Sequence, residues 1–452
     1  MRTLKTVRVQ SLRLTERKYE KIAHTLTCFK ESTNFLIEKC IKNPLFQKIS
    51  KKGNPYYDYS SYPKIRKNFY FEWKSSFPHL HTHYCHSSAR ITKDILKSWN
   101  SWCFKRRKRL PTPTYKKSSM KLEECLCYLD GNYIILVIEP RSKLYIPFKP
   151  TKHYNLLKTE NHGEITLKLN PNRTVDIFIP FITEVKIKEW KSITSIDINE
   201  RSINLIAIFP TKAEIACIDT SIISTTHYTY SLKRKTIAKS IDNGKKYQPS
   251  MRKRLLTKYG RIERNKNKND LHDIANKINE LVNENDSLVV MENLTDIRQV
   301  NSRQKNLKRW QPKKSKNMRR RLNRWNFKQF QQYLDYKATS TGHLVEYENP
   351  RNTSKRCLKC GGLTSCTTQT FVCKHCGFTI NRQVQAPFNI AEKYLTKRLK
   401  TPNKNKNVAS PVPAERQLMK TMLGELREFK ERIVRDASQC DEIYQTISVL
   451  SA

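Results

Sequence analysis

Four cysteines in the C-terminal part of the chain have the spacing of a metal site. Two C-x-x-C pairs are separated by 12 residues, and they are Cys357 with Cys360 and Cys373 with Cys376. Two such turns present four thiolates to one tetrahedral zinc ion. Gly361 and Gly377 follow the two pairs directly, and glycine tolerates the positive φ of a tight knuckle. The pattern predicts a zinc ribbon whose zinc is structural, because four thiolates leave no open coordination position.

Two acidic residues lie within otherwise apolar strand patterns. Asp197 is part of Ser192–Ile198, and Glu292 follows the apolar run Ser287–Met291. A carboxylate among isoleucine, valine, leucine and methionine is costly to bury without a partner. Hard divalent cations such as Mg²⁺ prefer carboxylate oxygens and would neutralise it. The residues alone leave two interpretations open, a metal-binding pair and two surface positions on polar faces.

Strands that alternate with helices must position these residues. The apolar patterns predict a hairpin, a basic helix, a short buried strand, a helix closed by Gly342 and a further strand, at about 192–209, 252–282, 287–291, 327–338 and 343–347. Acidic residues at the centre or end of apolar strands, with helices between them, are typical of an α/β layer fold.

The N-terminal part of the chain has a different pattern. A strand is expected at 7–14, and residues from about 15 to 110 are mostly helical, with apolar stripes at 19–40 and 89–104. Short β-rich runs follow at 133–138, 164–169 and 174–179, separated by turn sequences. These runs predict a small β-barrel or sandwich.

The charge of the chain favours a polyanionic partner. The 452 residues include 87 Lys and Arg against 40 Asp and Glu, which gives a net charge of +47. Such a charge weakens the compact state unless an anion neutralises it, and nucleic acid does so with release of counterions. The stretch 301–328 has 12 basic residues, no acidic residue and two tryptophans. The candidate nucleic-acid contacts are Arg106, Arg107, Arg309, Trp310, Arg319, Arg320, Arg321 and Arg324.

Other features exclude or weaken further classes. No apolar run approaches the roughly 18 residues that a membrane span needs, so we expect no membrane partner. The 13 cysteines are an odd number, which fits reduced thiols and not a disulfide framework. His79, His81, His83 and His86 lie close together, and we assign them to packing and nucleic-acid contact in preference to metal binding.

From Ser195 to Ile390 the sequence resembles the TnpB family of transposon-encoded proteins, relatives of the type V CRISPR effectors. The matching motifs are Ile196-Asp-Ile-Asn-Glu-Arg-Ser, Leu271-His272, Val289-Val-Met-Glu-Asn-Leu294, Trp325-Asn-Phe with Tyr336-Lys-Ala338, Asn349-Pro-Arg-Asn-Thr-Ser354, the two cysteine pairs and Asn389-Ile390. The resemblance implies a multidomain α/β protein with an RNase H-like (RuvC) nuclease domain, an inserted zinc ribbon and a preceding β-barrel with a helical insertion. It also implies a guide RNA and a double-stranded DNA target as partners, Mg²⁺ beside the structural zinc, and a cytoplasmic, nucleoid-associated prokaryotic protein.

The family layout suggests a division into domains. The expected parts are a wedge-like β-barrel domain at 1–14 and 111–188, a helical recognition insertion at 15–110, the RuvC-like domain at 189–348 and 383–400, the zinc ribbon at 349–382, and a linker with a polar tail at 401–452. The oligomeric state is not predicted.

One departure from the family pattern concerns the third catalytic residue. The family has an Asp seven residues after the last zinc cysteine, within Arg-Asp-x-Asn-Ala-Ala, whereas this chain has Arg382-Gln-Val-Gln-Ala-Pro387. Gln383 offers a neutral carbonyl oxygen in place of a carboxylate, and Glu392 is nine residues further on, on the opposite face of a helix. Because two-metal cleavage needs both ions in place, we expect Asp197, Glu292 and Gln383 to form an impaired site that holds Mg²⁺ weakly or in one position.

Three hypotheses follow from these observations. The first is an RNA-guided DNA-binding protein with weak or lost cleavage. The second is an active magnesium-dependent endonuclease in which another acid, or a water held by Gln383, completes the site. The third is a zinc-ribbon nucleic-acid binder that uses no guide.

Overall fold

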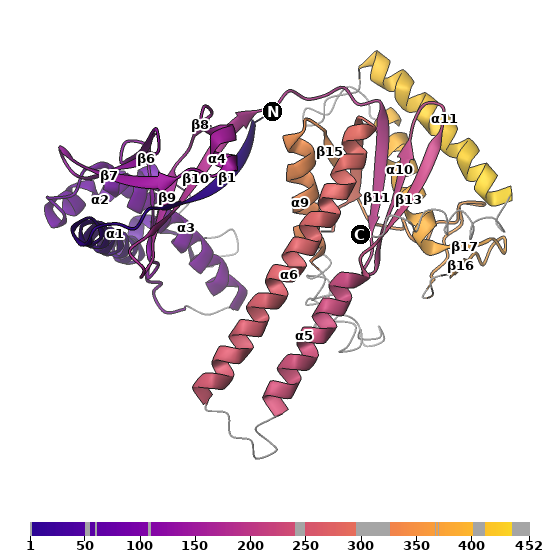
Figure 1. Cartoon of the computed structure of the whole chain (residues 1–452). Coiled ribbons are helices and arrows are strands. Elements are labelled where there is room, and N and C mark those ends of the chain that lie inside the picture. Colours follow the sequence, from indigo (N-terminus) through magenta and orange to yellow (C-terminus); the bar gives the residue numbers. More distant parts are fainter. Residues whose placement is uncertain are drawn as a thin grey trace. The chain divides into compact units, whose positions relative to one another are not determined.

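The computed structural model shows two compact units, Arg2–Glu184 and Val185–Ala452, each with its own sheet and helices (Figure 1). The structure describes residues 2–49, 55–58, 61–106, 110–239, 249–294, 326–366, 368, 370–400 and 412–435. No helix in this described part of the chain is long and apolar enough to cross a membrane. The two-unit division falls close to one predicted boundary, and the finer division into domains stays a prediction.

The first unit is built on an antiparallel sheet. Its strands are β1 (Arg2–Ser11), β4 (Ser119–Leu122), β5 (Cys127–Asp130), β6 (Tyr133–Glu139), β7 (Ser142–Lys149), β8 (Asn161–His162), β9 (Ile165–Leu169) and β10 (Val175–Glu184). They pair in the order β4-β9-β10-β1-β7-β6-β5, with β8 on β10. In β1, Val7 and Val9 are buried whereas Arg8 is exposed, so the alternation in the sequence sets which face meets the core. The described pairing is an open path from β4 to β5, and the barrel stays a prediction.

Helices between β1 and β4 pack on this sheet. They are α1 (Glu16–Lys42), η1 (Pro44–Phe46), α2 (Tyr62–Ser76) and α3 (His83–Arg106), with the small pair β2 (Gln47–Ile49) and β3 (Pro55–Tyr57), and α4 (Lys152–Leu157) follows β7. The predicted stripe of α1, which includes Ile22, Leu26 and Phe29, is buried. Tyr84 of α3 is wholly buried, and its hydroxyl donates to the Val137 carbonyl of β6 at 2.7 Å. Helices and sheet therefore share one core.

The second unit contains a mixed sheet in the order β13-β12-β11-β14-β15. Its strands are β11 (Ser192–Ile198), β12 (Ser202–Ile208), β13 (Ala213–Asp219), β14 (Ser287–Glu292) and β15 (Val345–Glu348). The strands β11 to β13 are antiparallel, and β14 and β15 run parallel to β11. The predicted α/β class and the predicted hairpin around Asp197 are confirmed.

Helices cover both faces of this sheet, as Figure 1 shows. The helices are α5 (Ser221–Lys239), α6 (Pro249–Glu284), α9 (Phe327–Ser340), α10 (Arg382–Lys400) and α11 (Pro413–Arg435), and the ribbon adds β16 (Thr370–Val372) and β17 (Thr379–Asn381). Ile196 and Met291 face the core with α6 and α9, whereas Ile193 and Val290 face the core with α10 and α11. Buried strands with apolar residues on both faces therefore lie between two helical layers.

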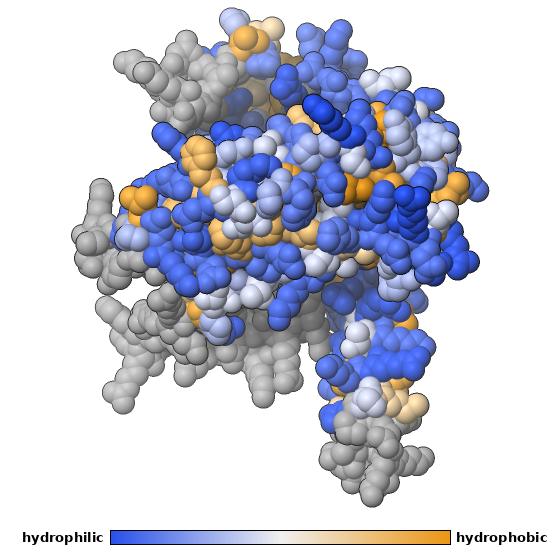
Figure 2. All heavy atoms as spheres, turned by 90° about the vertical axis from the view of Figure 1, so that its left-hand side faces the viewer, coloured by the Kyte–Doolittle hydropathy of each residue, from blue (hydrophilic) through white to orange (hydrophobic). Residues whose placement is uncertain are grey.

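Two parts of the second unit differ from the sequence analysis. The strand β13 and the helix α5 were not predicted. The polar helical stretch expected at about 415–436 within the C-terminal tail is confirmed as α11. Contrary to the prediction of a polar tail, this helix buries Met419, Met422 and Leu426 in the core on one face of the sheet. These residues recur every three or four positions within a charged sequence, so the average polarity concealed a narrow apolar stripe. Hydrophilic side chains cover most of the molecular face in Figure 2, with small scattered apolar groups.

Candidate functional site

Asp197 lies in the central strand of the second sheet. The residue is 8% exposed, because β11 is flanked by β12 and β14 and covered by α10. Its Oδ2 accepts a hydrogen bond of 2.6 Å from Asn199 Nδ2. The Ile198 backbone is a second hydrogen-bond partner. Both partners are neutral, and neutral partners compensate a buried charge only in part.

Glu292 is the last residue of β14, the neighbouring parallel strand. Ile196 pairs with Met291 in the register of the two strands, so Asp197 and Glu292 occupy the next positions and point to the same face of the sheet. The structure therefore brings together two acidic residues that are 95 positions apart in the sequence.

The two carboxyl groups affect one another. Burial raises the pKa of Asp197, and the Asn199 hydrogen bond and the charge of Arg382 act in the opposite direction. Burial also raises the pKa of Glu292, and the charge of Asp197 raises it further. Burial and mutual repulsion both disfavour the state in which the two carboxyl groups are ionised at once. A bound cation would stabilise that doubly ionised state.

A hydrogen-bond network fixes Glu292. The Thr353 hydroxyl donates to its carboxylate, and Gln331 Nε2 of α9 donates to its main-chain carbonyl at 2.6 Å. Asn389 Nδ2 of α10 donates to the carbonyls of Thr353 and Arg356 at 2.7 and 2.8 Å. Thr353 and Asn389 belong to motifs that carry the family resemblance, but the sequence assigned them no role. The signal for Thr353 was a polar residue in the turn four residues before the first cysteine pair.

The N-terminal part of α10 lies along β11. Ser195 Oγ of β11 donates to the Pro387 carbonyl inside α10 at 2.9 Å. Arg382, the first residue of α10, lies close enough for its charge to lower the pKa of Asp197. Gln383 follows Arg382, and the main-chain N–H of Gln383 donates to Asn381 Oδ1 at 3.0 Å. This turn contains no acidic residue, so α10 brings no carboxylate to Asp197 from its first turn.

Two other polar residues of α10 deserve comparison with this turn. Glu392 forms an ion pair with Lys430 of α11 at 3.3 Å, as expected for a residue on another face of the helix. Gln385 is wholly buried, and neither polar atom of its side chain has a hydrogen-bond partner among the described residues.

A third acidic residue, which was not predicted, lies beside Glu292. Glu348 is the last residue of β15, is 2% exposed, and pairs with Glu292 in the parallel register. Asp197, Glu292 and Glu348 therefore lie in a row on one face of three adjacent strands. Lys397 Nζ of α10 lies 2.6 Å from Glu348 Oε1. The sequence signal was an acidic residue at the end of an expected strand, as for Glu292.

The four ribbon cysteines converge as predicted. Their Sγ atoms lie within 4.8 Å of one another, and the distance is 3.8 Å for Cys357–Cys376 and 3.5 Å for Cys360–Cys373. Zinc–sulfur bonds of 2.3 Å in a tetrahedron separate the sulfurs by about 3.8 Å. The φ angles of Gly361 and Gly377 are 71° and 69°, as the knuckles require. The donor set therefore fits a zinc ion.

Most of the predicted nucleic-acid contacts lie outside the described residues. These are Arg107, Arg309, Trp310, Arg319, Arg320, Arg321 and Arg324. Arg106 is exposed at the end of α3, and its guanidinium lies 5.6 Å from the ring centre of Trp102.

Comparison with known proteins gives matches over most of the chain. Residues 327–390 match the family model described as the Cas12f1-like TNB domain, and residues 28–137 match that of the uncharacterized protein MJ0013 family. The TnpB-like protein MJ0751 of Methanocaldococcus jannaschii is 34% identical over 263 residues, which are 57% of this chain and 84% of that protein. The TnpB-like protein aq_aa05 of Aquifex aeolicus is 25% identical over 55% of this chain and 79% of its own length.

More distant matches involve CRISPR-associated proteins. The endodeoxyribonuclease Cas12f1 of Sulfoacidibacillus thermotolerans is 32% identical over 106 residues, 23% of this chain and 21% of that protein. Among solved structures, CasPhi-2 (Cas12j) bound to crRNA and phosphorothioate-DNA has a TM-score of 0.44 at 10% identity, over 90% of this chain and 92% of that one.

Proposed function

The chain belongs to the TnpB family, and from this membership we propose that it is an RNA-guided DNA-binding protein whose RuvC-type nuclease site is impaired. The order of the mixed sheet, with three antiparallel strands followed by two parallel ones, supports an RNase H-like domain. The partners would be a guide RNA and double-stranded target DNA. The net charge of +47 supports polyanionic partners on independent grounds.

The observation that carries this proposal is Gln383. The family pattern has an Asp here, and this chain has an amide in the turn of α10 that also contains Arg382, the residue whose charge reaches Asp197. An amide supplies one neutral oxygen and no charge. Two cations held close together need anionic ligands, so loss of one carboxylate lowers the affinity for at least one ion.

The remaining residues fit a magnesium site in their chemistry. Asp197 and Glu292 offer buried oxygens of the kind that Mg²⁺ prefers. Burial raises the pKa of each of the two carboxyl groups. When bound, Mg²⁺ would activate water and stabilise the leaving oxygen of a phosphodiester. The protein's part is to hold the ligands. Thr353 and Gln331 fix Glu292, and Asn199 orients Asp197.

For the first unit, we extend the proposal to a wedge-like β domain with a helical recognition insertion. The helices between β1 and β4 support such an insertion. Arg106, exposed over Trp102, combines a cation with an aromatic face, which suits contact with a phosphate and a base.

The test begins with the RNA. The protein is expressed with its native flanking locus, and the RNA that co-purifies is sequenced and used as the guide. Protein, guide and matched DNA are then incubated with Mg²⁺. We expect guide-dependent binding, little cleavage by the wild type, and a gain of at least 10-fold in Gln383→Asp but not in Gln383→Asn. Robust wild-type cleavage that Asp197→Ala abolishes would overturn the impaired site. Equal affinity for random duplexes without a specific RNA would indicate a guide-independent binder.

A second candidate function is an active magnesium-dependent endonuclease, and the position of Glu348 favours it. Its side chain lies beside Glu292 on the face that carries Asp197, so it could supply the anion that Gln383 lacks. This role requires the ion pair with Lys397 to open when the metal binds.

Glu348→Gln separates the two candidates. If Glu348 completes the site, this variant loses cleavage and binds Mn²⁺ at least 10-fold more weakly in calorimetric titration, and Gln383→Asp adds little. If the site is impaired, Glu348→Gln leaves Mn²⁺ affinity within about twofold of the wild type. Glu284→Gln, at the exposed end of α6, is the matched control for loss of one negative charge.

A further inference from the structure

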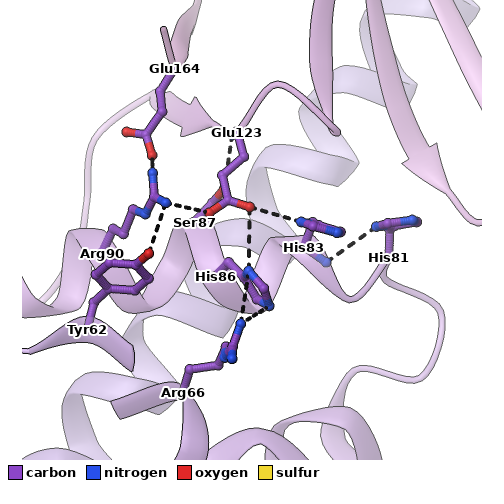
Figure 3. A network of polar contacts seen from close by, with 9 residues as sticks. All are labelled: Tyr62, Arg66, His81, His83, His86, Ser87, Arg90, Glu123 and Glu164. Carbon is purple, nitrogen blue, oxygen red and sulfur yellow. Dashed lines mark hydrogen bonds and ion pairs between the residues drawn. The ribbon is translucent and has the colours of Figure 1, made fainter. Parts of the chain in front are cut away.

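A second group of metal-ligating residues lies in the first unit, where α3 meets the segment after β4 (Figure 3). His83 and His86 are one turn apart at the start of α3, and Glu123 follows β4 directly. All three side chains are half-buried. The histidines were predicted to serve packing and nucleic-acid contact. Glu123 was not a candidate, because it lies 37 positions after His86 in the sequence.

The ligand atoms are already close to the spacing of a bound ion. His83 Nδ1 lies 2.9 Å and His86 Nδ1 3.5 Å from Glu123 Oε2, and ligand atoms of the three residues lie within 4.8 Å of one another. Zinc bonds of about 2.0–2.1 Å in a tetrahedron place neighbouring ligands about 3.3 Å apart. The distances of 2.9 and 3.5 Å lie on either side of this value.

We propose that His83, His86 and Glu123 bind a transition-metal ion of the zinc type, with a fourth position open to water. Two imidazoles and one carboxylate form a donor set that zinc uses in proteins. Imidazole also binds Co²⁺, Ni²⁺ and Cu²⁺, whereas Mg²⁺ and Ca²⁺ prefer sites made of oxygen ligands. This inference is independent of the proposed nuclease function.

Neighbouring residues hold Glu123 in place. Its amide N–H donates to Ser87 Oγ at 3.3 Å, and its other carboxylate oxygen, Oε1, lies 3.1 Å from Arg90 Nη2. Arg90 is itself held by an ion pair with Glu164 and lies over the ring of Tyr62, 4.6 Å from the ring centre. Outer contacts of this kind orient metal ligands in known sites.

Arg66 sets a condition for metal binding. Its Nη1 lies 2.9 Å from His86 Nε2, so in the metal-free network this nitrogen accepts a hydrogen bond. When Nδ1 of His86 binds a metal, Nε2 carries the proton, and Arg66 must turn away. Arg66 and His86 both line a cavity of about 580 Å³ with Lys67 and Tyr70, which gives the guanidinium room.

The charges predict selectivity. Arg66 and Arg90 lie beside the proposed ion, so a cation held by charge alone gains little there. An ion that forms strong bonds to imidazole nitrogen is favoured over one that does not. A bound ion would link the start of α3 to the segment after β4 and so stabilise the first unit.

The experiment uses the full-length protein and Co²⁺ as a probe. Metals are removed with a chelator, and one equivalent of Zn²⁺ is added to fill the four-cysteine site. Co²⁺ is then titrated and followed by absorption. We expect one further equivalent with the spectrum of a nitrogen and oxygen site and without the thiolate charge-transfer bands, unaffected by a millimolar excess of Mg²⁺.

Variants identify the ligands. Glu123→Gln and His83→Asn should each weaken the second Co²⁺ by at least 10-fold, whereas His153→Asn, an exposed histidine of α4, should not change it. Circular dichroism checks that each variant folds. Absence of a second equivalent in the wild type would overturn the proposal without reference to any variant. So would competition by Mg²⁺, or equal Co²⁺ affinity in Glu123→Gln and the wild type.

Discussion

The zinc ribbon and the carboxylate pair are two candidate metal centres of one unit. The ribbon was predicted from a local motif, whereas the carboxylate pair was predicted from residues in separate strands. The ribbon has four like ligands within 20 residues, two glycines in the required conformation and sulfur spacings that match a tetrahedral ion. The carboxylate site collects Asp197, Glu292 and the turn of Gln383 from separate elements. Its third family position has no carboxylate.

The difference shows where local sequence is sufficient and where topology is needed. A short motif fixes the geometry of its own ligands because the chain between them is a tight turn. A site built across strands depends on the register in which the strands pair. Here the register of β14 and β15 places Glu348 beside Glu292. The ribbon can thus be judged by spacing alone, but the acidic site cannot.

The largest effect should come from the ribbon. In Cys357→Ser with Cys373→Ser, the zinc site loses two ligands, and binding at structural zinc sites contributes about 10–16 kcal/mol. We expect loss of the thiolate charge-transfer band in Co²⁺-substituted protein and a clear fall in the melting temperature. Cys366→Ser, which lies outside the ligand set, should retain both. An unchanged charge-transfer band in the double variant would disprove the four-thiolate site.

The acidic site should give the next largest effect, through pH. Burial raises the pKa of Asp197 to about 6, so the native state holds this proton more tightly than the unfolded chain. The stabilisation is present below about pH 4 and is lost as the pH rises through about 6. In Mg²⁺-free buffer, Asp197→Asn should therefore exceed the wild type in stability at pH 8 by on the order of 3 kcal/mol, since the pKa rises by about two from its ordinary value and a shift of one corresponds to about 1.4 kcal/mol.

The measurement is urea unfolding of both proteins from pH 4 to pH 8. Asp286→Asn is the control with the opposite sign, because the Lys191 hydrogen bond and charge lower the pKa of Asp286. It should lose stability relative to the wild type at neutral pH. A difference between Asp197→Asn and the wild type that does not grow with pH would show that Asp197 is not held in a costly ionised state.

A smaller effect is expected where the two centres are joined. Thr353 donates to Glu292 and lies four residues before Cys357. Thr353→Val removes this hydrogen bond with little change in volume, and a lost hydrogen bond to a charged group costs about 1.5–3 kcal/mol. The pKa of Glu292 should rise further, because the lost bond favoured the ionised form.

Unfolding at pH 8 and the pH dependence of Mn²⁺ binding test this link. In Thr353→Val, Mn²⁺ binding should require a higher pH than in the wild type. Thr379→Val, at an exposed position of β17, supplies a threonine control. Identical pH profiles in Thr353→Val and the wild type would mean that the ribbon side does not position Glu292.

The smallest effect should be at Glu392. This residue pairs with Lys430, and a partly exposed ion pair contributes about 0.2–1 kcal/mol. Glu392→Gln should reduce stability by no more than that and leave Mn²⁺ affinity unchanged. A fall in Mn²⁺ affinity would assign Glu392 to the metal site. The acidic site would then have a third carboxylate and would no longer be incomplete in comparison with the zinc ribbon.

The sequence predicted the elements whose patterns are strong and local. The strand β11, the buried strand β14 and the stripe of α1 follow directly from apolar spacing. The pairing of β15 with β14 and the seat of α11 depend on contacts between distant segments, which periodicity does not encode. Asp197 and Glu292 were recognised as candidates because they interrupt strong local apolar patterns. Glu348 and Glu123 were not recognised, because their place in a site depends on contacts between distant segments.

Pro387 within α10 has a consequence for repair of the nuclease site. Proline has no amide hydrogen, so the usual helical bond from position 387 to the carbonyl four residues earlier, that of Gln383, cannot form. The family pattern has an alanine at position 387. This chain therefore differs from the family both in the side chain of residue 383 and in the helical hydrogen bond that the carbonyl of residue 383 would accept. A full return of cutting would therefore need Pro387→Ala together with Gln383→Asp, and the double variant should exceed the single one.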